Sequence, residues 1–251
     1  MDNRQIVAAA AKELFGDKDP TAVDRWVSPT YKQHSTVAAD GPEGLRSLIE
    51  SISPDVRFEV ARVLADDDHV AMHGTYYGFG PEPLVAFEIF RVEDGKLAEH
   101  WDGLTPQVAQ TVSGRTQTDG PAQVTHPEQT EASRALVTEF ADKVLVGQDY
   151  GALIDYISAE RYDQHNPEAA DGLDGFGAAA AAWAEQGKNL DYRTVHKVIA
   201  DGEFVLLQSE GTFGVPVAYY DLFRVDDGKI VEHWDAVVPV PAKLNHSNGV
   251  F

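Results

Sequence analysis

Apolar and polar residues follow a helical period at the start of the chain. Apolar positions recur about once per helical turn over residues 6–14, and the run stops at Gly16, which predicts an amphipathic first helix. A second helix is predicted to begin at Asp19-Pro20, because proline loses no backbone hydrogen bond at the first helical position. Apolar residues over 45–49 predict a third helix.

The period then changes to that of β-strands. Strands are predicted over residues 56–65, 69–77, 84–92 and 96–104. The second half repeats this order, with helices predicted over 130–146, 150–157 and 175–186 and strands over 192–200, 204–213, 217–225 and 229–238. The pairs Asp94-Gly95 and Asp227-Gly228 are predicted to form hairpin turns, where glycine accepts a positive φ. Strands joined by short turns pair antiparallel, so the fold class is α+β. A curved sheet over helices leaves a concave face for a small ligand.

The two halves also repeat in sequence. Residues 90–102 return as residues 223–235, so a Glu-His-Trp-Asp signature lies near the end of each half. We therefore predict two domains, over 1–106 and 128–251, with a linker at 107–127 that is rich in Gln, Thr, Gly and Ser. The duplication predicts that the two repeats pack through their sheets as an intramolecular pseudo-dimer.

Composition limits the partners of the chain. The formal net charge is −21, of which −9 lies before residue 126 and −12 after it, so neither half offers a face for nucleic acid or an anionic membrane. Cysteine is absent, which excludes disulfides and thiolate chemistry. No apolar run reaches the roughly 18 residues of a membrane span and no basic leader is seen, so the chain is interpreted as cytoplasmic.

Several motifs together carry a family resemblance. They are Tyr-x-Gln-His at 31–34 and 162–165, Asp-Gly before the third helix of each half, the 221–235 segment Asp-x-Phe-Arg-x-x-Asp-Gly-Lys-Ile-x-Glu-His-Trp-Asp, and the terminal Asn-x-x-Asn-x-x-Phe. With these motifs the chain resembles the SnoaL-like polyketide cyclase family of the nuclear transport factor 2-like superfamily. The resemblance implies two tandem cone-shaped α+β barrels, each with three helices on a curved antiparallel sheet. It also implies cofactor-free ring closure in which carboxylates and imidazoles in the cone move protons.

The His-x-Asp pairs are the first candidate catalytic groups. His233 and Asp235 lie two apart on a predicted strand and so share one face, and His100 and Asp102 repeat the arrangement. Such a pair suits proton abstraction next to a carbonyl. The alternative is that the pair closes the sheet with a polar face outward. A metal site would need His34 as well, and its spacing from the other candidates gives no ligand signature, so no metal is predicted.

Further candidates come from isolated polar residues. Asp221 and Glu88 each interrupt an apolar strand, so each either faces a ligand or forms a structural ion pair. His34 and His165 lie where the chain enters the sheet and either belong to the site or bond the backbone there. Candidate substrate-binding residues are Trp183, Tyr192, Phe213, Tyr76 and, through the resemblance, His73. The alternative for the aromatic residues is the hydrophobic core.

Together these features predict a cofactor-independent acid–base enzyme, a cyclase, isomerase or lyase, acting on a small and mostly apolar carbonyl compound. The alternatives are a hydrolase that opens epoxides and a non-catalytic binding protein. The repeats differ, because Ser35, Glu88 and His73 stand where the second repeat has Asn166, Asp221 and Gln208. The second repeat keeps more of the family's polar pattern, so we expect the principal site there, built from His165, Asp221, His233 and Asp235.

Overall fold

The computed structural model describes all residues from Met1 to Phe251, and these residues form two compact units that are described separately here. Unit 1 comprises Met1–Gln107 and Pro241–Phe251, and unit 2 comprises Val108–Val240. Most of the segment interpreted from sequence as a linker thus belongs to unit 2, and the C-terminal residues assigned to the second repeat belong to unit 1. Both segments are held there by hydrogen bonds that are described below.

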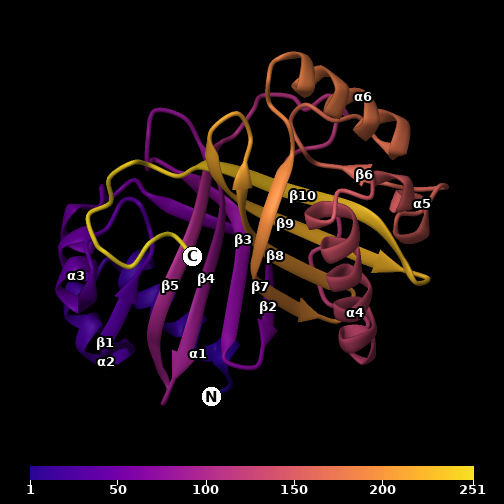
Figure 1. Cartoon of the computed structure of the whole chain (residues 1–251). Helices are drawn as coiled ribbons and strands as arrows, with labels where there is room; N and C mark the ends of the chain where they lie inside the picture. The colour runs from indigo at the N-terminus through magenta and orange to yellow at the C-terminus, as the bar shows by residue number, and fades with distance from the viewer. The chain divides into compact units, whose positions relative to one another are not determined.

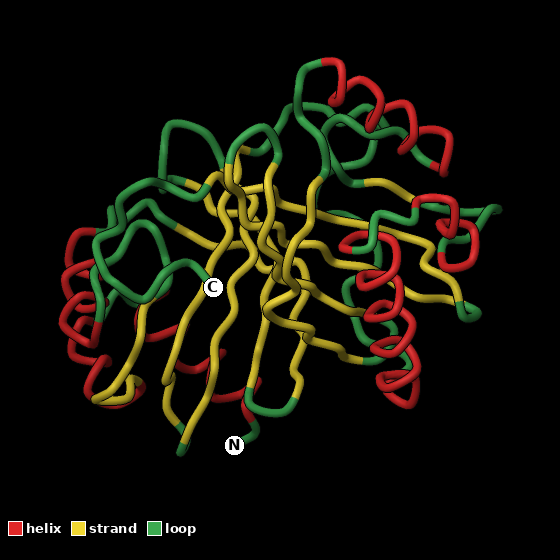
Figure 2. The backbone as a smooth tube through the Cα atoms, viewed as in Figure 1, coloured by secondary structure: helices red, strands yellow, loops and turns green.

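Unit 1 begins with its helices, and its five strands form one sheet (Figures 1 and 2). The helices are α1 (Asn3–Ala11), the π-helical turn η1 (Lys12–Gly16), the 3-10 turn η2 (Pro20–Ala22), α2 (Val23–Trp26) and α3 (Gly41–Ser51). The strands are β1 (Val27–Gln33), β2 (Arg57–Asp66), β3 (His69–Tyr77), β4 (Leu84–Glu93) and β5 (Lys96–Pro106), in the spatial order β1-β5-β4-β3-β2.

Unit 2 repeats the sheet order, as β6-β10-β9-β8-β7. Its helices are the 3-10 turn η3 (Pro127–Gln129), α4 (Thr130–Phe140), the π-helical turn η4 (Ala141–Val146), the 3-10 turn η5 (Tyr150–Ala152), α5 (Leu153–Tyr156) and α6 (Gly172–Glu185). Its strands are β6 (Asp163–Gln164), β7 (Asp191–Asp201), β8 (Phe204–Thr212), β9 (Pro216–Asp226) and β10 (Lys229–Pro239). The α+β class predicted from sequence is confirmed in both units.

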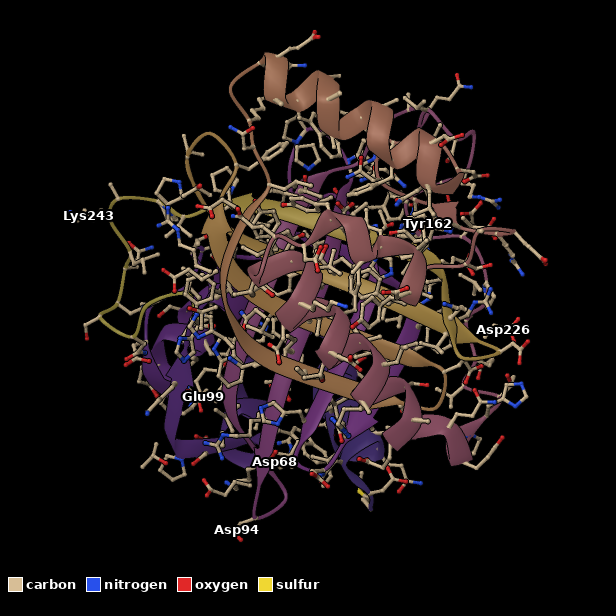
Figure 3. All side chains as sticks on the ribbon, turned by 45° about the vertical axis from the view of Figure 1, so that its right-hand side comes forward. Asp68, Asp94, Glu99, Tyr162, Asp226 and Lys243 are labelled. Carbon is tan, nitrogen blue, oxygen red and sulfur yellow. The ribbon has the colours of Figure 1, made fainter.

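The predicted hairpin turns are also confirmed. Asp94 and Gly95 join β4 to β5 with φ of 51° and 76°, and Asp227 and Gly228 join β9 to β10 with φ of 47° and 70°. A two-residue turn with both φ positive matches the twist of the strands that it connects. Figure 3 shows Asp94 and Asp226 at hairpin ends, so these acidic turns lie away from the sheet centre.

Strands β1 and β6 were not predicted, and they position the first polar residues of each unit. Each pairs in parallel with the last strand of its unit, so that Gln33 lies opposite His100 and Gln164 opposite His233. The sequence of β1 is mostly polar and contains a proline, and β6 has only two residues, so neither shows the hydrophobic alternation of a strand. They exist because the edge of the last strand offers free backbone groups for pairing.

The core of each unit lies between the helices and one face of the sheet. In unit 1 the predicted helix positions Ile6, Val7, Ala10 and Leu14 are all buried, and α3 buries Leu45 and Ile49. In unit 2 the corresponding core includes Val137, Phe140 and Val144 against Phe223 of β9. No helix in the structure is both long enough and apolar enough to cross a lipid bilayer.

Candidate functional site

Residues of β5 alternate between the two faces of the sheet in unit 1. His100 and Asp102 face the helices and line a cavity, whereas Trp101 faces the other way and stacks on His34 at 4.9 Å between ring centroids. The same alternation holds on β10, where His233 bonds Asp221 and Trp234 stacks on His165 at 4.6 Å. The prediction that each His-x-Asp pair shares one face is confirmed.

The cavity of unit 1 has a volume of about 660 Å³ and is mostly apolar. Side chains of α1, α3 and β2 to β5 form most of its walls. Its polar lining beyond the backbone consists of Lys12, Lys18, Tyr31, Gln33, Ser35, Asp55, Arg57, Tyr76, Glu88, His100 and Asp102. This volume accommodates an organic molecule of several rings, which would contact a mainly apolar surface and be oriented by the polar side chains.

Two hydrogen bonds fix the imidazole of His100. Its Nε2 lies 2.7 Å from Oε2 of Glu88, and its Nδ1 lies 2.8 Å from Oε1 of Gln33. The same Gln33 oxygen accepts the backbone N–H groups of His34 and Ser35, at 3.1 and 3.0 Å. Because this atom accepts from two backbone donors it is the amide oxygen, and His100 Nδ1 must therefore carry a proton. The remaining labile proton lies between His100 Nε2 and Glu88.

Burial and neighbouring charge tune these groups. Burial by itself lowers the pKa of His100, but the hydrogen bond to Glu88 and the charges of Glu88 and Asp102 outweigh it and raise the pKa above its ordinary value. Burial and the nearby Glu88 charge raise the pKa of Asp102 to about 6, although His100 and the hydroxyl of Ser35 act in the opposite direction. Ser35 Oγ donates to Asp102 Oδ2 at 2.6 Å. At neutral pH Asp102 is therefore a carboxylate close to its titration point.

Two tyrosines complete the polar part of the cavity. Burial and the charges of Glu88 and Asp102 raise the pKa of both Tyr31 and Tyr76 well above the ordinary value. Both therefore keep their hydroxyl protons at neutral pH. Tyr31 accepts a hydrogen bond from Gln33 Nε2 at 3.2 Å, and Tyr76 hydrogen-bonds Glu88. Tyr76, predicted to bind substrate, thus lines the cavity beside the acidic group.

Unit 2 holds an equivalent polar set. His233 lies 3.1 Å from both Asp221 Oδ1 and Gln164 Oε1, through Nε2 and Nδ1 respectively. Asn166 Nδ2 donates to Asp235 Oδ2 at 2.6 Å, in the position that Ser35 takes in unit 1. Burial, offset by His233 but supported by the Asp221 charge, raises the pKa of Asp235. Burial lowers the pKa of His233, and its hydrogen bond to Asp221 and the carboxylate charges raise it overall.

The aromatic residues near the second acid can be compared between the two units. Tyr192 donates its hydroxyl to both oxygens of Asp221 at 3.2 Å and stacks on Tyr219 with a centroid separation of 4.0 Å. Tyr219 is fully buried two residues before Asp221, and the small Ala86 stands at the equivalent position before Glu88. In unit 1, Tyr76 likewise hydrogen-bonds Glu88 and stacks on Phe58, and Glu88 also lines the cavity.

His34 and His165 lie on the opposite face of the sheet from the His-x-Asp pairs. His34 Nε2 bonds Glu99 at 2.9 Å, and His165 Nε2 bonds Glu232 at 3.0 Å. The structure therefore does not bring either histidine together with the candidate acid–base groups. Each ring instead stacks on a tryptophan of the neighbouring strand. Through Nδ1, His34 bonds the backbone oxygen of Gly249 and His165 bonds that of Thr116.

The other predicted binding residues also lie outside the cavity of unit 1. His73 stacks on Phe87 with a centroid separation of 4.2 Å and lies 2.6 Å from Arg62 through its Nδ1, on the outward face of β3. Trp183 and Phe213 pack edge to face in unit 2. Conversely, sequence analysis did not select Tyr31, Gln33 or Ser35. The Tyr-x-Gln period of two was a signal that Tyr31 and Gln33 share a face.

Each polar set includes possible metal donors. One donor atom each from Glu88, His100 and Asp102 lies within 4.8 Å of the others, and Asp221, His233 and Asp235 form a similar group. One imidazole and two carboxylates can bind a divalent cation. In both groups, however, the histidine Nε2 already bonds a carboxylate directly, so a cation would have to replace that hydrogen bond.

Comparisons with known proteins identify the domain. No curated protein matches the chain. Among solved structures, TsrD from Streptomyces laurentii is 21% identical over 41% of this chain and 90% of its own, with a TM-score of 0.36. IdmH from Streptomyces antibioticus is 19% identical over 41% and 92%, with a TM-score of 0.35. A SnoaL-like polyketide cyclase from Agrobacterium tumefaciens is 15% identical over 42% and 92%, with a TM-score of 0.36.

A family model decides the assignment, because it matches most of the chain in two separate segments. The SnoaL-like domain matches residues 7–100, which end at His100 in β5, and residues 137–233, which end at the equivalent His233 in β10. Each matched segment begins within the first α-helix of its unit, α1 or α4, and ends within the last strand, β5 or β10. With this twofold match, the chain belongs to the SnoaL-like domain family and carries two tandem copies of its α+β cone.

Proposed function

We propose that the protein is a cofactor-independent acid–base enzyme that acts on a small, mostly apolar carbonyl compound, and that the cavity of unit 1 is its principal site. One observation carries this proposal. Glu88, His100 and Asp102 lie together on the wall of a largely apolar cavity of about 660 Å³. An apolar cavity selects the substrate, and the titratable group supplies the chemistry.

Asp102 is the proposed general base. With a pKa of about 6 it is ionised at neutral pH and still basic enough to take a proton from a carbon next to a carbonyl. The developing enolate oxygen needs a hydrogen-bond donor, and the hydroxyl of Tyr76 lies in the same cavity, where it would exchange its hydrogen bond to Glu88 for one to the substrate. The positive charge on His100 offsets the negative charge that forms on the substrate. Aldol ring closure and double-bond migration both begin with this proton transfer.

The proposal places the site in unit 1 and not in unit 2, contrary to the expectation from sequence. The reason is the cavity, because Glu88, His100 and Asp102 line it together and the small Ala86 stands where unit 2 has the ring of Tyr219. The first repeat departs from the family motif at Ser35, but the equivalent hydrogen bond is kept. Ser35 donates to Asp102 as Asn166 donates to Asp235.

The test is hydrogen exchange at carbon. The ketone 2-tetralone is a suitable probe, because it is apolar and its α-protons are activated by a carbonyl and a ring. In deuterated buffer the wild-type protein should accelerate loss of its α-proton NMR signals over buffer alone, and excess EDTA should not change the rate. Asp102→Asn should reduce the enzymatic rate by about 10²- to 10⁴-fold. An unchanged rate in Asp102→Asn would contradict the assignment of Asp102 as base.

The same panel of experiments separates the alternatives. Transfer of ¹⁸O from labelled water into styrene oxide, without exchange of 2-tetralone, would favour an epoxide hydrolase. Tight binding of 2-tetralone with neither reaction would favour a binding protein. The exchange assay is the primary test, because the cavity offers a base and a donor that both suit enolate formation.

A further inference from the structure

We infer that the C-terminal segment Pro241–Phe251 is a positioning element for the site of unit 1, because it fixes the backbone of residues 33–35 from outside the cavity. The inference rests on the proposed function and extends it to residues that lie far away in sequence. None of the residues of this segment lines the cavity, so any effect on the reaction must act through the residues that the segment holds.

The segment makes four hydrogen bonds around residues 33–35. Asn248 Nδ2 donates to the backbone oxygen of Gln33 at 3.0 Å and to Asp40 Oδ1 at 2.7 Å. His246 Nε2 donates to the backbone oxygen of Ser35 at 2.9 Å. The backbone oxygen of Gly249 accepts from His34 Nδ1 at 3.0 Å. Each of the three consecutive residues 33–35 is therefore held from the outer side.

The side chains of the same residues hold the acid–base groups from the inner side. Gln33 accepts from His100 Nδ1, and Ser35 donates to Asp102. Gln33 can do this only in one orientation, which depends on the backbone N–H groups of His34 and Ser35. A shift of this short segment would therefore alter both the proton on His100 and the hydrogen bond to Asp102. Small displacements of catalytic groups have large effects on rate.

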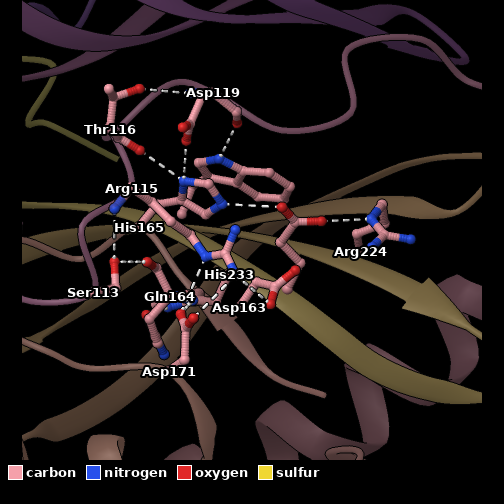
Figure 4. A network of polar contacts seen from close by, with 12 residues as sticks. Ser113, Arg115, Thr116, Asp119, Asp163, Gln164, His165, Asp171, Arg224 and His233 are labelled. Carbon is pink, nitrogen blue, oxygen red and sulfur yellow. Dashed lines mark hydrogen bonds and ion pairs between the residues drawn. The ribbon is translucent and has the colours of Figure 1, made fainter.

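Unit 2 has the same device, built from a different part of the chain (Figure 4). Ser113 Oγ donates to the backbone oxygen of Gln164 at 2.6 Å, and the backbone oxygen of Thr116 accepts from His165 Nδ1 at 2.7 Å. Arg115 bonds Asp171, at 3.1 and 3.0 Å, much as Asn248 bonds Asp40. Because the contacts correspond, the repeated histidines His34 and His165 serve as docking points for the covering segments.

Each of these two segments follows, in sequence, the last strand of the other unit. The segment after β5, which carries Ser113, Arg115 and Thr116, belongs to unit 2, and the segment after β10, Pro241–Phe251, belongs to unit 1. Consequently the site proposed in the first repeat depends on residues that follow the last strand of the second repeat. This dependence gives a matched pair of variants within one chain, since Asn248 serves unit 1 and Ser113 serves unit 2 in the same way.

The experiment compares Asn248→Asp with Ser113→Ala in the full-length protein, with 2-tetralone exchange as the readout. The isosteric Asn248→Asp replaces the donor by an acceptor facing an oxygen and Asp40, and it should lower kcat about 10- to 100-fold with little change in KM. Ser113→Ala should leave the rate within about 2-fold of wild type. Asn248→Ser, which keeps one donor, should recover part of the loss.

The pH profile separates a positioning role from simple destabilisation. Loss of the Ser35 hydrogen bond raises the pKa of Asp102, so the acidic limb of the rate profile should move to higher pH in Asn248→Asp. Thermal unfolding by circular dichroism verifies that each variant is folded at the assay temperature. An unchanged kcat and an unchanged acidic limb in folded Asn248→Asp, or a larger loss in Ser113→Ala, would overturn the inference. If Asp102→Asn is also fully active, the proposed function has failed instead.

Discussion

Asp102 shows how the surroundings of one residue set its chemistry. The sequence places an aspartate two residues after a histidine in both repeats, and in both units the structure places it beside a second acid, half-buried in unit 1 and buried in unit 2. Period-two reasoning was enough to predict which side chains share a face. It could not reveal Gln33, whose role depends on a parallel pairing between strands far apart in sequence.

The activity of the protein should rise with pH as Asp102 ionises, with an acidic limb near its pKa of about 6. The hydrogen bond from Ser35 lowers this pKa, so Ser35→Ala should move the limb to higher pH. The rate of 2-tetralone exchange, measured between pH 4.5 and pH 8, gives the midpoint of the acidic limb and resolves a shift of about one pH unit. A limb that stays in place or moves to lower pH would contradict the role given to Ser35.

The same pKa makes a prediction for stability. The folded-state pKa of about 6 lies above the ordinary value of 3.8, so the folded protein pays for ionising Asp102 above pH 6 and the penalty disappears below pH 4. Asp102→Asn should therefore unfold at higher denaturant concentration than wild type at pH 7.5, by at most about 3 kcal/mol. This advantage should vanish towards pH 4. A variant that is both inactive and less stable at pH 7.5 would count against a strained catalytic carboxylate.

The elements of the fold follow closely from local sequence signals. The long strands and the Asp-Gly turns were predicted, because their alternation and turn residues are strong. The strands β1 and β6 were not, because they depend on tertiary pairing. The expectation of a principal site in the second repeat came from motif residues, whereas the proposal for unit 1 rests on a cavity, which sequence periodicity does not reveal.

Exchanging the residues at positions 86 and 219 tests whether the substrate binds in the cavity of unit 1. Ala86 is fully buried and lies two residues before Glu88 on the same face of β4, so Ala86→Tyr should push neighbouring lining side chains into the cavity and raise KM for 2-tetralone at least about 10-fold. Tyr219→Ala should cost about 3–5 kcal/mol of folding free energy and leave the exchange rate of unit 1 unchanged. Denaturant titration and the exchange assay measure both. Normal KM in folded Ala86→Tyr would show that the substrate binds elsewhere.

On the scale of the whole molecule, the chain passes between the units twice. It leaves unit 1 after Gln107 and returns to it after Val240. Two connections restrict independent motion more than a single linker does, and they keep the partner unit at an effective concentration of roughly millimolar or higher. We therefore expect the repeats to associate within one chain as a pseudo-dimer.

Small-angle X-ray scattering combined with light scattering checks this association. The expected result is a monomer with a compact single-peaked distance distribution. An extended profile with two separated lobes would mean that the units tumble independently, and the pairing of the repeats would then be wrong. The covering role of Pro241–Phe251 would not be affected, because its contacts lie within unit 1.

Two double variants test whether the proposed acid–base chemistry on carbon takes place in unit 1. The 2-tetralone exchange rates of His100→Ala/Asp102→Ala and His233→Ala/Asp235→Ala are compared in otherwise intact protein. We expect the first variant to lose its activity over buffer, by about 10²-fold or more, and the second to retain it. Loss of activity in the second variant with retention in the first would contradict the proposal and place the site in unit 2.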